Sequence, residues 1–249
     1  MTASGPGTDS PTAAILVAAG RSQRMHGIDK TLAPLAGRPT AAWSIEVFAR
    51  CDAIHTIVLV SGEKNHEALQ SLGVEFGRGK VLAVVPGGAR RQDSVANGLR
   101  ALEPAASTGL VAIHDIARPL TTESTILRGL ELAAEHGAAV ASVAITDTVK
   151  HVNEDGVIER TIDRNTVRAV QTPQVFRLDL LRRAHATFAD SAANVDGSPI
   201  TDDAMLVEAL GHSVLAYESD GPNLKITTAI DIAVAEMLLT ARLRPVGDS

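Results

Sequence analysis

The stretch "AILVAAGRSQRM", residues Ala14–Met25, determines how the rest of the chain is interpreted. It starts with an apolar run typical of a strand buried on both faces and ends in a turn of small residues. Basic side chains follow at Arg21, Arg24 and Lys30. Neither of the standard phosphate loops, G-x-x-x-x-G-K-[ST] and G-x-G-x-x-G, occurs at this turn. The stretch therefore predicts a strand and a cationic loop that hold phosphate in another way.

The alternation of strand and helix continues to about residue 145. After the first strand, from residue 13, further strands are predicted at 54–60, 81–85, 110–114 and 138–145, and helices at 40–50, 64–72, 91–102 and 122–135. Repeated βα units of this spacing favour an α/β fold with a doubly wound, mostly parallel sheet of the Rossmann-like type.

This rhythm breaks at residues 148–162, where two short alternating segments flank an Asp-Gly turn at Asp155. The pattern is typical of a β-hairpin. The hairpin is polar on at least one face and has no helix to cover it, so we expect an arm that projects from the sheet at about residues 147–166. Further elements are predicted beyond the arm: strands at 168–175, 212–218 and 223–227, and helices at 178–189, from the N-cap Thr201 to Leu210, and from Ile230.

Composition excludes several classes of partner. The net charge is −6, and only four Phe, one Trp and one Tyr are aromatic, so we expect no nucleic-acid partner. No apolar run approaches the ~20 residues that span a bilayer, so we expect no membrane partner. Cys51 is the only cysteine, which favours a reducing, cytoplasmic location.

The domain organisation follows from the same composition. Residues 1–12 are rich in Gly, Pro, Ser and Thr and lack the features of a secretory signal, so they are predicted to form a disordered tail. Residues 13–243 show no internal repeat and no second core. They are predicted to form one domain that carries the arm.

Polar and glycine residues follow four of the predicted strands. The first is followed by the loop of Arg24 and Lys30, the third by "PGGARRQDS", the fourth by "HDIARP" and the fifth by "TDTVK". Ligands of open α/β sheets bind at the carboxyl ends of the strands. Taken singly, each residue has a structural explanation: Arg24 and Arg91 as solvated charges, His114 as a hydrogen-bonded strand end, Cys51 as packing. Four such strand ends together favour a site.

The residue types at this edge favour chemistry on a polyphosphate. Cations and backbone N–H groups stabilise charge on phosphate oxygens. Asp115 is the carboxylate best placed for Mg²⁺, which prefers oxygen ligands. No Ser-His-Asp order and no activated cysteine points to acyl transfer instead.

The motifs "AAGRSQRM", "PGGARRQDSV", "HDIARP", "DTVK", "RAVQTPQVF", "TDDAMLVE" and "NLKITT" occur in this order between residue 13 and about residue 242. In this order they resemble the motifs of 2-C-methyl-D-erythritol 4-phosphate cytidylyltransferases. The first motif is shared with many nucleotidyltransferases, whereas "HDIARP", "RAVQTPQ" and "TDDAMLVE" are far more specific. The resemblance implies a nucleotidyltransferase that joins CTP and methylerythritol 4-phosphate, with Mg²⁺, in the non-mevalonate isoprenoid pathway.

The resemblance also implies roles for individual residues. Arg24 and Lys30 would stabilise the pentavalent α-phosphorus, and Asp115 would hold Mg²⁺. The nucleotide would be bound by Ala18, Ala19, Gly20, Gly88, Ala89 and Ser94, and the polyol phosphate by Arg118, Thr148, Arg164, Thr201 and Lys225. The arm would form a homodimer, in which Arg164 reaches the active site of the partner.

Four residues depart from the resembled pattern. Asp29 stands where proline is usual, Ser22 where a second glycine is usual, Ala89 where a polar residue is common, and Ile116 where a small alanine is usual. A carboxylate at Asp29 is expected to draw positive potential from the site, and Ile116 to add bulk at the pocket floor. These features leave two alternatives: a cytidylyltransferase for another polyol phosphate, such as ribitol 5-phosphate, and a non-catalytic nucleotide-binding paralogue.

Overall fold

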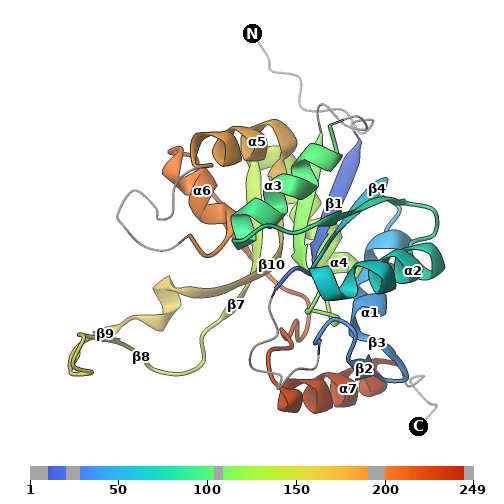
Figure 1. The fold of residues 1–249 in the computed structure, drawn as a ribbon. Helices are drawn as coiled ribbons and strands as arrows, with labels where there is room; N and C mark the ends of the chain where they lie inside the picture. The colour runs from blue at the N-terminus through green and yellow to red at the C-terminus, as the bar shows by residue number, and fades with distance from the viewer. Residues whose placement is uncertain (1–10, 21–28, 104–108, 190–199, 244–249) are drawn as a thin grey trace.

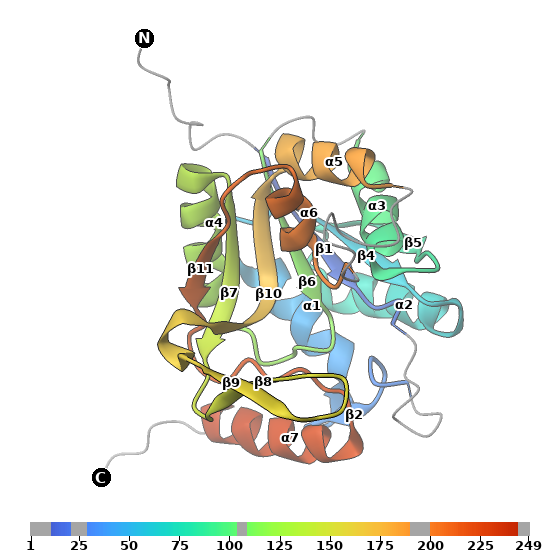
Figure 2. The same cartoon turned by 90° about the vertical axis from the view of Figure 1, so that its left-hand side faces the viewer.

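The structure, a computed structural model, describes residues 11–20, 29–103, 109–189 and 200–243. Its centre is a sheet of β1 (Thr12–Val17), β4 (Thr56–Ser61), β5 (Val81–Pro86), β6 (Leu110–Asp115), β7 (Ala138–Ala144), β10 (Arg168–Arg177) and β11 (Leu215–Glu218). The strand order is β11-β7-β10-β6-β1-β4-β5, which can be followed in Figure 2, a turned view of the fold drawn in Figure 1. Every neighbouring pair is parallel except the two that involve β10. The predicted doubly wound, mostly parallel sheet is confirmed.

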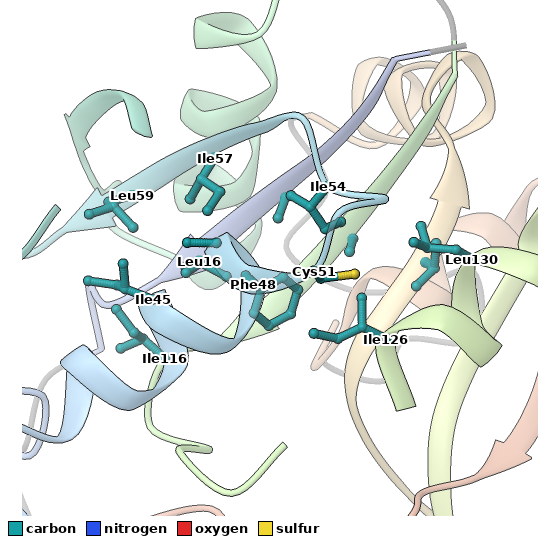
Figure 3. Packing of buried hydrophobic residues seen from close by; sticks show 14 of the residues in the cluster. Leu16, Ile45, Phe48, Cys51, Ile54, Ile57, Leu59, Ile116, Ile126 and Leu130 are labelled. Carbon is teal, nitrogen blue, oxygen red and sulfur yellow. The ribbon is translucent and has the colours of Figure 1, made fainter. Parts of the chain in front are cut away.

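Helices cover both faces of this sheet. They are α1 (Thr40–Arg50), α2 (His66–Phe76), α3 (Arg91–Ala101), α4 (Glu123–His136), α5 (Leu178–Thr187) and α6 (Asp203–Ala209). One buried cluster joins the sheet to α1, α2 and α4, and a second joins it to α3, α5 and α6. Figure 3 shows Phe48, Cys51 and Ile116 within the first cluster. Cys51 is fully buried there, so its predicted role in packing is confirmed.

Ile116 was expected at the pocket floor, and this expectation is wrong. Its side chain is fully buried in the first cluster. The backbone of Ile116 is held by its neighbours, since its carbonyl accepts from Ser44 Oγ at 2.8 Å and its N–H donates to the carbonyl of Val17 at 3.1 Å. The turn after β6 therefore directs this side chain into the core.

A third buried cluster lies below the sheet. It joins the C-terminal helix α7 (Ala229–Leu243) to Leu35 of the short strand β2 (Pro34–Leu35), which pairs with β3 (Arg38–Pro39). The segment 223–227, predicted to be a strand, is irregular in the structure. After β11 the chain leaves the sheet and crosses the carboxyl ends of other strands, where Ile226 N–H donates to the carbonyl of Ala117 at 2.8 Å.

The predicted hairpin is present and projects from the sheet (Figures 1 and 2). It pairs β8 (Val149–Val152) antiparallel to β9 (Ile158–Ile162). Its turn is held by Asn153, whose Oδ1 accepts from the backbone N–H of Asp155 at 3.1 Å and of Val157 at 2.9 Å.

Several predicted boundaries shift by a few residues, among them the start of β1 and the start of α6. β1 already begins at Thr12, paired with Leu110, and residues 1–10 of the predicted tail lie outside the described residues. The N-cap of α6 is Asp202, whose Oδ1 accepts from Met205 N–H at 3.0 Å, rather than Thr201. The described part of the chain holds no helix that is both long and apolar enough to span a membrane.

Candidate active site

A cavity of about 210 Å³ opens at the carboxyl ends of β1, β5 and β6. β1 has β4 on one side and β6 on the other, so strand order reverses here, which is where ligands of such sheets bind. Predicted site residues from distant parts of the chain line the cavity: Ala18, Ala19, Gly20, Lys30, Gly88, Ala89, Ser94, Asp115 and Lys225.

Two glycines let the loop after β5 lie close against its neighbours. A Cβ at Gly87 would stand 2.2 Å from the Cβ of Ala19, and one at Gly88 would stand 2.3 Å from the Cβ of Asp93. Gly88 N–H donates to Ser94 Oγ at 3.0 Å. The loop leads directly into α3, whose first residues line the cavity. The positive end of the helix dipole therefore faces the space where a phosphate would lie.

Asp115 is the carboxylate of the cavity and lies between two cations. Its Oδ2 is 2.5 Å from Lys225 Nζ, and its Oδ1 is 3.6 Å from Arg91 Nε. Burial raises the pKa of Asp115, but the charges of Arg91 and Lys225 outweigh burial and hold that pKa well below its usual range. The carboxylate is therefore ionised at neutral pH.

Arg91 also pairs with a second carboxylate, so its reading as a solvated charge is wrong. Arg91 Nη1 lies 2.6 Å from Oδ2 of the fully buried Asp203, at the start of α6. Oδ1 of Asp203 lies 3.0 Å from His185 Nε2. Burial raises the pKa of Asp203, but the charge of Arg91 and the hydrogen bond from His185 lower it by more. Arg91 thus ties α6 to the cavity.

His114 is fully buried beside Asp115 and is hydrogen-bonded on both sides. The carbonyl of Arg118 can only accept, so His114 Nε2, 3.3 Å away, carries the proton of the neutral imidazole. Nδ1 then accepts from Thr172 Oγ1 at 3.1 Å, while that same hydroxyl accepts from Asp115 N–H at 3.0 Å. Burial lowers the pKa of His114 to about 3. The histidine is a neutral structural residue, as its sequence position indicated.

The irregular segment after β11, residues 223–227, is hydrogen-bonded to residues around the cavity and contributes Lys225 to its lining. Arg118 Nη1 donates to the carbonyl of Asn223 at 2.7 Å, and Asn223 Nδ2 donates to the carbonyl of Thr172 at 2.7 Å. These bonds place Lys225 next to Asp115. Burial lowers the pKa of Arg118, whose Nε is buried without a hydrogen-bond partner among the described residues. Arg118 holds this segment in place through Asn223 but does not line the cavity.

Other predicted residues lie apart from the cavity. Thr148 is exposed just before β8, and Thr201 is exposed before α6. Arg164 is exposed in a short 3-10 helix after the arm, and its guanidinium donates to the carbonyl of Thr146. Arg24 lies outside the described residues.

The polar residues of this region that were not predicted as site residues include Thr172, Gln174 and Asp203. Gln174 is buried, and its Oε1 accepts from the N–H groups of Asp203 at 3.1 Å and Ala204 at 3.2 Å. These residues belong to the motifs "RAVQTPQVF" and "TDDAMLVE", which contributed to the resemblance. Nothing in those stretches indicates which residues their side chains contact.

Known proteins match the chain along nearly its whole length. The family model for 2-C-methyl-D-erythritol 4-phosphate cytidylyltransferase (IspD) matches residues 12–241. A relative of that description from Dehalococcoides mccartyi strain CBDB1 is 42% identical over 226 residues, which cover 91% of this chain and 95% of the relative. One from Symbiobacterium thermophilum is 41% identical, covering 96% of this chain and 97% of the relative.

Solved structures agree with these sequence matches. The crystal structure of 4-diphosphocytidyl-2C-methyl-D-erythritol synthase from Anaerococcus prevotii DSM 20548 superposes with a TM-score of 0.81 at 27% identity, covering 93% of this chain and 96% of that one. The matches include the strand ends that line the cavity. The chain belongs to the 2-C-methyl-D-erythritol 4-phosphate cytidylyltransferase family.

Proposed function

We propose that the chain transfers the CMP moiety of CTP to 2-C-methyl-D-erythritol 4-phosphate, in the non-mevalonate isoprenoid pathway. The observation that carries the proposal is the arrangement of Lys30, Arg91 and Lys225 around the glycine turn and helix N-terminus at one strand edge. A phosphate oxygen of methylerythritol 4-phosphate bonds to the α-phosphorus of CTP. The bond from that phosphorus to the bridging oxygen breaks, and pyrophosphate leaves.

Charge stabilisation and positioning account for the catalysis. Lys30 Nζ lies beside Gly20 in the loop that follows β1, since a Cβ at Gly20 would stand 3.6 Å from it. A fixed cation there stabilises the negative charge that develops on the α-phosphoryl oxygens. The attacking phosphate is already ionised, so the reaction needs no general base, and alignment of the two phosphates supplies much of the rate. Arg24 is proposed to act with Lys30.

Recognition of cytosine is proposed to use backbone groups and Ser94 rather than aromatic stacking. Ala18, Ala19 and Gly88 line the cavity, and because they carry at most a methyl group, a base can lie close to the backbone there. Hydrogen bonds to the base edge discriminate well between bases, because a mismatched base leaves a buried polar group unpaired.

The residues present fit a Mg²⁺ ion that is completed by the substrate. The described residues contain no group of three or more His, Cys, Asp or Glu side chains placed to hold a metal. Mg²⁺ in phosphoryl-transfer sites takes one or two carboxylates and obtains its other ligands from phosphates and water. Asp115, ionised and at the cavity, would be that carboxylate. Bound there, the ion would neutralise phosphate charge.

We also propose a homodimer through the arm, with Arg164 of one subunit binding substrate phosphate in the other. Val152 is 49% exposed, and Val157 and Ile158 are each 59% exposed, so the arm presents apolar surface to solvent. Exposed strand edges of this kind are covered when a second chain pairs with them. Arg164 is exposed and away from the cavity of its own chain.

A cytoplasmic location is also part of the proposal. It is supported by the single cysteine, Cys51, which is buried and free.

The dimer proposal is tested by mixing Arg164→Ala protein with Lys30→Ala protein. Each variant is expected to be nearly inactive alone. Half of randomly exchanged dimers are mixed, and each mixed dimer has one intact site, so about a quarter of the sites should regain activity. Mixing restores nothing if Arg164 acts in its own subunit.

The substrate is tested by measuring pyrophosphate release from CTP with a panel of polyol phosphates. Methylerythritol 4-phosphate is expected to give the highest kcat/KM. Ile116, which favoured ribitol 5-phosphate, lies in the core rather than in the cavity. Faster reaction with ribitol 5-phosphate would overturn the proposal, and CTP binding without turnover of any alcohol would identify a non-catalytic paralogue.

A further inference from the structure

The carboxylate of Asp29, the residue directly before Lys30, is hydrogen-bonded within the protein. Its Oδ1 accepts from the N–H of Thr31 at 2.9 Å and from Thr31 Oγ1 at 2.7 Å. Its backbone carbonyl accepts from Leu32 N–H at 3.0 Å and Ala33 N–H at 2.9 Å. The two residues on either side of Lys30 are therefore bonded to each other, and the turn that carries the lysine is closed at its base.

Asn65, at the end of the short 3-10 helix Glu63–Asn65, joins this turn to the loop Ala18–Gly20, which follows β1. It is 3% exposed. Its Nδ2 lies 2.9 Å from Asp29 Oδ2, 3.0 Å from Thr31 Oγ1 and 3.3 Å from the carbonyl of Ala18. Its Oδ1 accepts from Gly62 N–H at 2.8 Å, so every partner matches one orientation of the amide.

We propose that Asp29 and Asn65 are positioning residues for Lys30, an inference that rests on the proposed cytidylyl transfer. Asn65 fixes the distance between the lysine turn and the loop at Ala18 and Gly20, against which Lys30 Nζ lies. A proline at position 29 would restrict the backbone before the lysine through its ring. Asp29 restricts the same turn through hydrogen bonds made by its side chain.

This assignment opposes the electrostatic expectation for Asp29. A carboxylate that only lowers the positive potential of the site would slow the reaction, and its removal would speed the reaction. The observed carboxylate instead accepts three hydrogen bonds from Thr31 and Asn65. Its removal frees the turn, and displacement of a catalytic group by about 1 Å can cost on the order of 100-fold in rate. The two accounts therefore predict changes of opposite sign.

The experiment compares Asp29→Ala, Asp29→Asn, Asn65→Ala and the Ala/Ala double variant in steady-state pyrophosphate release from CTP and methylerythritol 4-phosphate. We expect Asp29→Ala and Asn65→Ala each to lower kcat about tenfold or more, with little change in KM for CTP. Asp29→Asn keeps the Oδ1 acceptor for Thr31 but places an NH2 group opposite Asn65 Nδ2, so its kcat should fall between those of the wild type and Asp29→Ala, whereas the electrostatic account predicts a faster enzyme for both variants. Because both residues act on one turn, the double variant should lose much less than the product of the two single losses.

Asp179→Ala is the matched control for charge. It also removes one carboxylate, but from the first turn of α5, which follows the carboxyl end of the antiparallel β10 at the opposite edge of the sheet. Its kcat should equal that of the wild type.

The outcomes separate this inference from the proposed function. An inactive wild type overturns the proposed function, and the inference falls with it. If the wild type is active, the inference alone is overturned when Asp29→Ala or Asp29→Asn is as fast as the wild type or faster. A loss confined to KM for CTP would also overturn it, because it would indicate a binding role instead.

Discussion

The buried His114 makes a quantitative prediction about pH. The residue is fully buried, and burial lowers its pKa to about 3, even though Asp115 beside it favours the charged form. Both ring nitrogens are hydrogen-bonded in the neutral form, to Thr172 and to the carbonyl of Arg118. An unfolded histidine takes up a proton near pH 6.5. Between these two pKa values the unfolded chain binds one more proton than the folded chain at this site.

The sign and size of the effect follow from linkage. Because the unfolded state binds the extra proton, the free energy of unfolding falls as the pH is lowered below 6.5. From pH 7 to pH 5 the loss from His114 is about 2 kcal/mol. This value is insensitive to the folded pKa as long as that pKa lies below about 4. Paired carboxylates such as Asp115 lose their contribution only when the pH falls below their unfolded pKa of about 4, outside this window.

The assay is urea denaturation at pH 7, 6 and 5 for the wild type, His114→Gln and His136→Gln. The first variant cannot titrate at this position, so its decline between pH 7 and pH 5 should be about 2 kcal/mol smaller than that of the wild type. The second removes a histidine from the end of α4 whose side chain is 45% exposed, and it should decline as the wild type does. An unchanged decline in His114→Gln would refute the reasoning.

Three further predictions concern the site. Lys30→Ala should lower kcat about 100-fold with a modest change in CTP affinity, because the α-phosphate carries more charge in the transition state; near-normal turnover would exclude the assigned role. CTP should exceed UTP in kcat/KM, since uracil places a carbonyl where cytosine donates from its amino group; equal values would contradict cytosine recognition. Asp203→Ala should lower the free energy of unfolding by about 3–5 kcal/mol, because Arg91 would lose its closest buried partner; urea denaturation measures this loss, and one below 1 kcal/mol would contradict the pairing.

The sheet was predictable because its signals are local. β1 is a continuous apolar run, as a strand buried on both faces requires, and α1 was predicted with its observed ends. The direction of β10 was not predictable, since a strand that is buried between two others has a similar composition in either direction. The segment 223–227 has the composition of a strand, but its partners are loops and strand ends, which no local pattern specifies.

The site was predictable to the extent that strand ends meet at one edge. That rule brings Gly20, Gly88 and Asp115 together without knowledge of the side chains. The pairing of Arg91 with Asp203 depends on how α6 packs, over 112 residues of separation. Asn65 lies in the polar 3-10 helix before α2, where side chains are usually exposed. Its role depends on its side chain being buried, which the sequence does not indicate.

The crossing segment that carries Lys225 has a consequence for the order in which the protein is made. Asp115 is synthesised 110 residues before the lysine that pairs with it. While the ribosome is still adding β10, α6 and β11, the strand edge exists without that cation and without Asn223 to hold Arg118. Contacts of such sequence separation form late, because the loop between them must be ordered first. The first strands of the nascent chain therefore form well before the active site is complete, and a chain stalled on the ribosome before residue 223 lacks the lysine and the asparagine that complete the cavity.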